Sequence, residues 1–244
     1  MLVMENETLH MPLIGERAPE FTAETTQGTI MFPSDYKGKW VILFSHPSDF
    51  TPVCTTEFMM FEKLRPELEK MNCALVGLSV GNVASHIAWL RSIREKIEFK
   101  GLRNVDVRFP LVADPTMEIA RKYGMVSMSI SSTKAVRAVF FIDPAAIVRA
   151  IIYYPPTLGR NFDEIRRTLQ GLQAVDRYGV ALPADWRPGD DIIVPATDSH
   201  AEADRNMEGR KKDGVRCYDW YFCVKSWRDV AAPAEHDKET VKSL

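Results

Sequence analysis

The sequence predicts an α/β fold in which a mixed central sheet is flanked by helices and followed by a C-terminal arm. Over the first 175 residues, short apolar runs typical of buried strands alternate with segments whose apolar residues recur every three or four positions. After residue 175 the sequence becomes polar and rich in proline, and it ends in an aromatic segment, RCYDWYFCVKSW. We therefore expect one domain over residues 1–175 and an arm or dimerisation segment, without a second packed core, over residues 176–244.

The first clear strand and helix adjoin each other. WVILFS, residues 40–45, is a continuous apolar run and predicts a buried strand. A helix is predicted to follow, with Thr51 as its N-cap and Pro52 in its first position. Its apolar face is formed by Phe58, Phe61, Leu64, Leu68 and Met71.

The next elements repeat the alternation of strand and helix. ALVGLSV, residues 74–80, predicts a second buried strand, and residues 83–97 predict a helix with Asn82 as its N-cap. Residues 110–114, PLVAD, predict the end of a strand that leads into a helix over residues 117–123.

The last part of the domain predicts a hairpin and a helix. RAVFFI (137–142) and VRAIIYY (148–154) flank the turn residues Asp143 and Pro144. Asn161 followed by Glu164 is typical of a helix start. An antiparallel hairpin added to parallel strands makes the sheet mixed.

Composition and charge exclude several function classes. Apolar residues make up 45% of the 244 residues, charged residues 26%, and the net charge is −2. These values predict a globular protein with no general affinity for nucleic acid or membranes. No apolar run is long enough to span a bilayer, and residues 1–10 lack the basic start of a signal peptide. We expect a cytoplasmic location.

The four cysteines are too few for a disulfide scaffold in a chain of this length. In a reducing cytosol, cysteines that pair are more often redox-active than structural. Cys217 and Cys223 lack a second Cys/His pair with zinc-finger spacing, so a metal site is not expected, and from the residues alone both could be spectators. No cofactor is expected either. Cys73, at the start of a predicted buried strand, fits a core position.

Cys54 is placed differently, in the first turn of the predicted helix after residue 51. Unpaired backbone N–H groups and the positive end of the helix dipole favour a thiolate there over a thiol. A buried core cysteine is the alternative, but hydroxyls and helix-start residues surround this one. A fast thiol enzyme also needs donors that act on the transition state, for which an arginine is the obvious candidate.

These segments resemble the peroxiredoxins. PSDFTPVCTTEF resembles their active-site pattern P-x-x-x-T/S-x-x-C, and FSHP, CTTE and YYPPTLGRNFDE resemble the peroxiredoxin 6-like branch. RCYDWYFC further resembles archaeal thioredoxin-type peroxidases, and the likeness runs from Leu13 to Trp227. The resemblance implies a thioredoxin-like fold with a C-terminal arm, and thiol-dependent reduction of hydrogen peroxide and organic hydroperoxides.

The resemblance also implies roles for individual residues. Cys54 would be the peroxidatic cysteine, and Thr51 would hydrogen-bond both its sulfur and the peroxide. Pro47 would shield the sulfur from water, and Arg137 would hold the thiolate and the peroxide oxygens. Arg160 would be a second, outer arginine, although from the residues alone it fits a surface ion pair equally well. His46 either tunes the site or simply ends the strand with a satisfied hydrogen bond.

The same resemblance implies how the oxidised sulfur is rescued. Cys223 would resolve the sulfenic acid on Cys54 of the partner subunit, with Cys217 as its possible second partner. A thioredoxin-like protein would reduce the resulting disulfide. Homodimers would assemble into a ring, a decamer of five dimers. Two alternatives stay open: a 1-Cys peroxidase that uses an external thiol, and a chaperone-like holdase.

Overall fold

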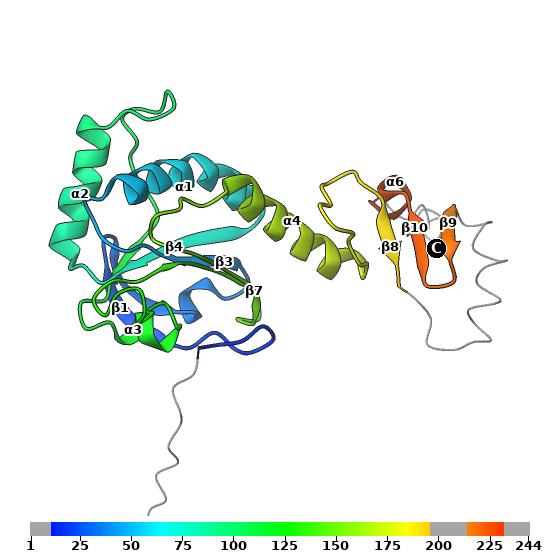
Figure 1. Cartoon of the computed structure of the whole chain (residues 1–244), viewed down its shortest axis with the longest axis horizontal. Coiled ribbons are helices and arrows are strands. Elements are labelled where there is room, and N and C mark those ends of the chain that lie inside the picture. Colours follow the sequence, from blue (N-terminus) through cyan, green and yellow to red (C-terminus); the bar gives the residue numbers. More distant parts are fainter. Residues whose placement is uncertain (1–10, 196–213, 232–244) are drawn as a thin grey trace, which may run out of the picture. The chain divides into compact units, whose positions relative to one another are not determined.

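The computed structural model of the chain describes residues 11–195 and 214–231 (Figure 1). It divides into two compact units between Phe162 and Asp163. The first unit holds the central sheet and the strand-to-helix junction at Cys54. The second unit holds most of the last long helix and the arm.

A seven-stranded mixed sheet forms the centre of the first unit, as predicted. Its strand order is β2-β1-β5-β4-β3-β6-β7. The β3–β4 and β4–β5 pairs are parallel, and the other pairs are antiparallel. The strands are β1 (Phe21–Thr25), β2 (Gly28–Phe32), β3 (Trp40–Ser45), β4 (Cys73–Ser79), β5 (Leu111–Ala113), β6 (Arg137–Ile142) and β7 (Val148–Tyr154).

Helices cover the sheet, and the four predicted helices are confirmed. They are α1 (Pro52–Lys70), α2 (Val83–Lys96), α3 (Glu118–Lys122) and α4 (Phe162–Tyr178), with a short 3-10 helix, η1 (Ser34–Tyr36). Thr51 and Asn82 are the N-caps of α1 and α2, and the Asn82 side chain accepts a hydrogen bond from the Ser85 N–H at 2.8 Å.

All six residues of β3 are buried, because side chains cover both faces of this strand. On one face Val41 and Leu43 belong to a core cluster that includes Tyr123. On the other face the ring of Phe44 stacks on Phe61 of α1, with ring centres 3.9 Å apart. Burial on both faces explains why β3 reads as an unbroken apolar run.

The β1–β2 hairpin was not predicted. It lies at one edge of the sheet and pairs in the register Phe21↔Phe32 to Thr25↔Gly28. Its exposed and half-buried residues alternate, so the apolar signal is weaker than in β3.

The second unit contains a three-stranded antiparallel sheet in the order β8-β10-β9. The elements are β8 (Ile192–Val194), β9 (Val215–Asp219), β10 (Phe222–Lys225) and a short helix, α6 (Trp227–Ala231). Trp186, Ile192 and Cys223 are buried in it, and the Trp186 ring packs edge-on against Trp227. The expectation of an arm without a packed core is therefore wrong. The core is built from residues scattered along the sequence, which leave no apolar run to detect.

No helix in the described part of the chain is both long and apolar enough to cross a membrane.

Candidate active site

Cys54 lies in the first turn of α1, directly after the loop that follows β3. Its side chain is fully buried, and Pro47 in the loop is buried as well. Nη1 of Arg137 donates a hydrogen bond to the Cys54 Sγ at 3.3 Å. The Cys54 sulfur therefore lies within hydrogen-bond distance of a guanidinium.

Strand pairing brings Arg137 to the sulfur. β6 runs antiparallel to β3, with Val139 opposite Phe44, so the first residue of β6 lies beside the last residue of β3. The Ser45 hydroxyl fixes this end of the pair, because it donates to the Val136 carbonyl at 2.6 Å and accepts from the Ala138 N–H at 3.1 Å. The junction between β3 and α1 therefore faces the start of β6.

Other contacts hold the Arg137 guanidinium in one orientation. Its Nε and Nη2 both donate to the Pro156 carbonyl, at 3.1 and 2.7 Å. The side chain is almost fully buried. A guanidinium held in this way presents Nη1 to the sulfur without having to reorganise when negative charge develops there.

Glu57 is a site residue that the sequence reasoning missed. It is buried three residues after Cys54, and its Oε2 accepts from Nη1 of Arg137 at 2.5 Å and from Nη1 of Arg160 at 2.7 Å. Its Oε1 accepts from the Arg160 backbone N–H at 2.9 Å. The CTTE segment contained the signal, since residues three apart share a helix face. Arg137 and Arg160 were expected at the site, but their contacts with Glu57, from segments far away in the sequence, were not foreseen.

Arg160 is buried, so its interpretation as a surface ion pair is wrong. Its Nη2 donates to the carbonyls of Ser45 and Ala138, and its guanidinium lies over the Phe44 ring. Burial lowers the pKa of Arg160 to about 10, with Glu57 acting in the opposite direction, so the side chain remains cationic at neutral pH. Its bonds tie Glu57 to the ends of β3 and β6.

Thr51 occupies the N-cap with extended backbone, but its side chain makes no capping hydrogen bond. Its hydroxyl donates to the Ser48 carbonyl at 2.9 Å, within the loop. The oxygen keeps lone pairs that can accept a hydrogen bond from a ligand. Its bond to the sulfur and the peroxide stays a prediction.

His46 and Asp49 belong to a buried network under the same loop. The Asp49 carboxylate contacts Nε2 of His46 at 3.0 Å and Nδ1 of His86 at 2.8 Å, and it accepts from the Ser85 hydroxyl at 2.6 Å. Both histidine side chains are fully buried, and Nδ1 of His46 has no partner among the described residues. Asp49 thus ties the loop to the start of α2, a role that the sequence reasoning did not foresee.

The network changes two pKa values. Burial lowers the pKa of His46 to about 4, although the hydrogen bond to Asp49 acts against this. Burial alone raises the pKa of Asp49, but the bonds from His46, His86 and Ser85 outweigh it and hold that pKa below its usual range. At neutral pH the pair is therefore a neutral imidazole donating to a carboxylate.

Cys73 fits the predicted core position. It is buried in β4 opposite Trp40, and burial raises the pKa of its thiol to about 12. Such a thiol stays protonated at neutral pH and is a poor nucleophile.

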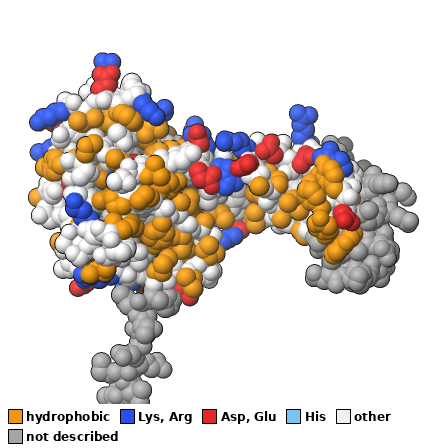
Figure 2. Space-filling view, viewed as in Figure 1, with side chains coloured by type: hydrophobic (Ala, Val, Ile, Leu, Met, Phe, Trp, Pro, Cys, Tyr) orange, Lys and Arg blue, Asp and Glu red, His pale blue; other side chains and the backbone are white. Residues whose placement is uncertain are grey.

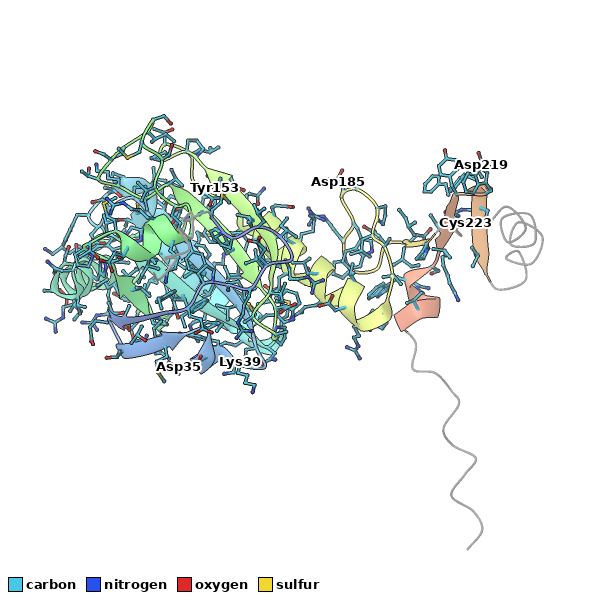
Figure 3. The ribbon with its side chains drawn as sticks, turned by 90° about the horizontal axis from the view of Figure 1, so that it is seen from below. Asp35, Lys39, Tyr153, Asp185, Asp219 and Cys223 are labelled. Atoms are coloured by element: carbon cyan, nitrogen blue, oxygen red, sulfur yellow. A yellow bond between two sulfur atoms is a disulfide. The ribbon has the colours of Figure 1, made fainter. Side chains whose placement is uncertain are left out.

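Cys217 and Cys223 stand directly opposite each other on β9 and β10 and are joined by a disulfide (Figure 3). Cys54 and Cys73 are free thiols. Among the described residues, no cluster of His, Cys, Asp or Glu is arranged to hold a metal ion.

Two family models match the chain. The model of the AhpC/TSA family matches residues 14–151, and the model of the C-terminal domain of 1-Cys peroxiredoxin matches residues 171–209. The first match contains Cys54, Glu57 and Arg137, and neither range includes Cys217 or Cys223.

Relatives and solved structures agree with these matches. A peroxiredoxin of Methanosarcina mazei is 56% identical over 215 residues, 88% of this chain and 98% of the relative, and one of Archaeoglobus fulgidus is 46% identical over 218 residues, with the same coverage. A structure of yeast mitochondrial 1-Cys peroxiredoxin is 40% identical with a TM-score of 0.75, and covers 88% of this chain and 100% of its own. Peroxiredoxin 6 of Arenicola marina is 34% identical with a TM-score of 0.74, over 88% of this chain and 98% of its own.

Proposed function

This chain belongs to the AhpC/TSA family and is a thiol peroxidase of the peroxiredoxin type, and on that premise we propose that Cys54 is its peroxidatic cysteine. The observation that carries the proposal is the 3.3 Å contact between the fixed guanidinium of Arg137 and the Cys54 sulfur in the first turn of α1. Cys73, with its raised thiol pKa, is not a candidate.

The reaction follows from this geometry. The Cys54 thiolate attacks one oxygen of hydrogen peroxide or an organic hydroperoxide, the S–O bond forms and the O–O bond breaks. The second oxygen leaves with the electron pair and takes a proton, giving water or an alcohol, and Cys54 becomes a sulfenic acid. Arg137 and the N–H groups of the first turn stabilise the growing negative charge. Glu57 holds Arg137 and is itself bound by Arg160. Thr51 is assigned the hydrogen bond to the peroxide, and His46, fully buried beneath the loop, contacts Asp49.

We assign the resolution of the Cys54 sulfenic acid to the C-terminal arm. The Cys223 thiol of the partner subunit attacks the sulfenic sulfur, water leaves, and a disulfide joins Cys54 to Cys223. Cys217 then attacks the Cys223 sulfur, which frees Cys54 and leaves the Cys217–Cys223 disulfide. The facing positions of these two cysteines support the last step. A thioredoxin-like dithiol protein would restore both thiols.

A 1-Cys cycle is the second candidate, in which an external thiol reduces the sulfenic acid directly. Two observations favour it: the match to the C-terminal domain of 1-Cys peroxiredoxin, and the likeness to the yeast mitochondrial 1-Cys enzyme, which is resolved via glutathione and thioredoxin systems. The two cycles differ in whether Cys217 and Cys223 are needed.

Peroxiredoxins are typically oligomeric and use thiol reductants. For this chain we propose homodimers, because resolution across subunits requires at least a dimer. The assembly of five dimers into a decameric ring is proposed from the resemblance to the peroxiredoxins alone. We also propose a cytoplasmic location, since the buried free thiols of Cys54 and Cys73 suit a reducing compartment.

The test measures peroxide consumption with dithiothreitol as the thiol donor. Cys54→Ser is expected to abolish turnover, whereas Cys73→Ser, the matched control in the core, retains it. Arg137→Lys keeps the charge but loses the planar fork, and is expected to lower kcat/KM for peroxide by about 100-fold. Equal rates for wild type and Cys54→Ser would end the proposal.

A further inference from the structure

The two cysteines that form the disulfide between β9 and β10 differ in burial. Cys217 is half-buried, whereas Cys223 is only 1% exposed. In thiol–disulfide exchange the incoming thiolate must reach one of the two sulfur atoms, so access decides which one it attacks. Cys217 is the more exposed of the two cysteines in this hairpin, and on that ground it is the better target for a reductant.

Exposed aromatic side chains occupy the turn between the two cysteines. Four of the five residues between the two cysteines are aromatic, and they are exposed: Tyr218 by 62%, Trp220 by 50%, Tyr221 by 57% and Phe222 by 39%. We call these four residues the aromatic tip. Hydrophobic side chains are visible at the surface of this unit in Figure 2, and Figure 3 shows Asp219 at the same end of the hairpin.

The aromatic tip is ordered within itself. The rings of Tyr218 and Phe222 stack with centres 5.1 Å apart, and those of Trp220 and Tyr221 meet edge to face at 5.6 Å. Aromatic residues held rigid and exposed are unusual on a free surface, and they are the residues that dominate binding energy where proteins dock. The guanidinium of Arg216 lies over the Tyr218 ring and pairs with Asp191.

We propose that the aromatic tip is the docking surface for the protein dithiol that reduces this chain, and that the nucleophilic cysteine of that protein attacks Cys217 rather than Cys223. The proposal rests on the proposed function, in which the Cys217–Cys223 disulfide is a stage of the catalytic cycle. The occupant is a small dithiol protein with an apolar rim around its reactive thiol, because the tip joins an apolar surface to one accessible sulfur.

Reduction of the Cys217–Cys223 disulfide takes place in two thiol–disulfide exchange steps. A donor thiolate attacks the Cys217 Sγ, a mixed disulfide forms, and the electron pair of the broken S–S bond leaves on Cys223, which takes up a proton. The second donor thiolate then attacks the donor sulfur of the mixed disulfide and releases Cys217 as a thiolate. The donor is oxidised to a disulfide, and the hairpin regains two thiols.

A second copy of this chain is the competing occupant. A copy seated permanently on the tip would close off the sulfur that is left accessible, so the position of Cys217 favours the dithiol protein. Measuring the oligomeric state distinguishes the two occupants. If a donor docks on the aromatic tip, loss of the tip should alter reduction by that donor. If a second copy docks there, loss of the tip should alter subunit assembly.

The first experiment compares two donors on the full chain, a bacterial thioredoxin recycled by its reductase and the small dithiol dithiothreitol. In the double variant Trp220→Ala/Tyr221→Ala, the ratio of thioredoxin-supported to dithiothreitol-supported peroxide turnover should fall by at least about tenfold, as for the loss of an aromatic hot spot. Met128→Ala, which removes an exposed apolar side chain elsewhere, should keep the wild-type ratio.

The second experiment traps the intermediate with a thioredoxin variant that lacks its second cysteine. Peptide mass spectrometry should find the mixed disulfide on Cys217. Two results would overturn the docking proposal. One is an adduct on Cys223. The other is an unchanged ratio of thioredoxin-supported to dithiothreitol-supported turnover in the double variant, whether or not its oligomeric state is altered. Wild type that turns over with dithiothreitol but not with thioredoxin would also overturn it, while leaving Cys54 as the peroxidatic residue. Loss of turnover with both donors would instead remove the proposed function.

Discussion

At the residue scale, charge balance is the main feature of the site. Arg137 and Arg160 are both buried cations, and Glu57 is the carboxylate that touches both of them. A thiolate on Cys54 would add the second negative charge and make the set of four neutral. Glu57 is thus a positioning residue that keeps two guanidinium groups close together despite their repulsion.

Glu57→Gln tests this balance. The variant leaves two buried cations facing a neutral amide, so we expect the free energy of unfolding to fall by about 3 kcal/mol. Arg137 should also lose its fixed orientation, and kcat/KM for peroxide should fall along with stability. Urea denaturation and peroxide kinetics measure the two effects. Glu95→Gln, which breaks an exposed ion pair, should change neither. Full stability in Glu57→Gln would show that the two arginines do not need this carboxylate.

The buried His46 predicts a dependence of stability on pH. Its pKa is about 4 in the folded chain against an ordinary value of 6.5, so the unfolded chain binds a proton first as the pH falls. The contribution of His46 to the free energy of unfolding is fully present above pH 6.5 and is lost as the pH falls from 6.5 to 4. The loss is on the order of 3 kcal/mol. The groups that face His46 are Asp49, His86 and Arg160, and the lowered pKa of Asp49 acts only at still lower pH.

Urea unfolding measured at several pH values checks this prediction. Wild type should lose stability steadily over that interval, and His46→Gln should show a smaller slope because it has no proton to bind there. Equal slopes in the two proteins would mean that His46 does not titrate as its burial implies.

At the element scale, local signals in the sequence predicted the junction between β3 and α1. An apolar run, a capping threonine and a proline lie within a dozen residues of one another, so Cys54 could be placed in the first helical turn. The contacts of Glu57 and Asp49 could not be foreseen in this way. Glu57 meets arginines 80 and 103 positions away, and Asp49 meets a histidine 37 positions away. Only the folded sheet brings those segments together.

The elements that the sequence did not predict were missed for related reasons. The β1–β2 hairpin is half-exposed and lacks an apolar run, and the core of the second unit uses Trp186 and Cys223, which are widely separated in the sequence. Strands buried on both faces, such as β3, gave the strongest sequence signal.

If Cys223 resolves Cys54 as proposed, the first turn of α1 must open during the cycle. Cys54 is fully buried, so the sulfur of another cysteine cannot reach it in this conformation. We expect amide hydrogen exchange in residues 52–58 to be faster in protein trapped with Cys54 in a disulfide than in reduced protein, while residues 73–79 of β4 exchange equally slowly in both. Mass spectrometry of peptides from the two forms measures this. Equal protection of the first turn in both forms would exclude opening of α1 as the route to resolution.

At the scale of the whole molecule, the proposed cycle would divide peroxide chemistry and reduction between the two units. The first unit holds Cys54 and its arginines, and the second unit holds the disulfide and the aromatic tip. In the proposed cycle, formation of the Cys217–Cys223 disulfide would free Cys54 to react with another peroxide before the second unit is reduced. In a 1-Cys cycle the same disulfide would have no part in turnover.

Non-reducing gels of single-cysteine variants separate these cycles. After one equivalent of peroxide, Cys217→Ser should accumulate a covalent dimer joined by Cys54 and Cys223. The dimer persists because this variant has no Cys217 thiol to attack the Cys223 sulfur. Wild type should pass through this dimer and end as monomer with the Cys217–Cys223 disulfide, and Cys223→Ser should give no dimer. Cys73→Ser is the control and should behave as wild type, since that thiol is buried with a raised pKa. A Cys217→Ser protein that stays monomeric and still turns over with thioredoxin would remove the arm from the cycle and leave the 1-Cys mechanism.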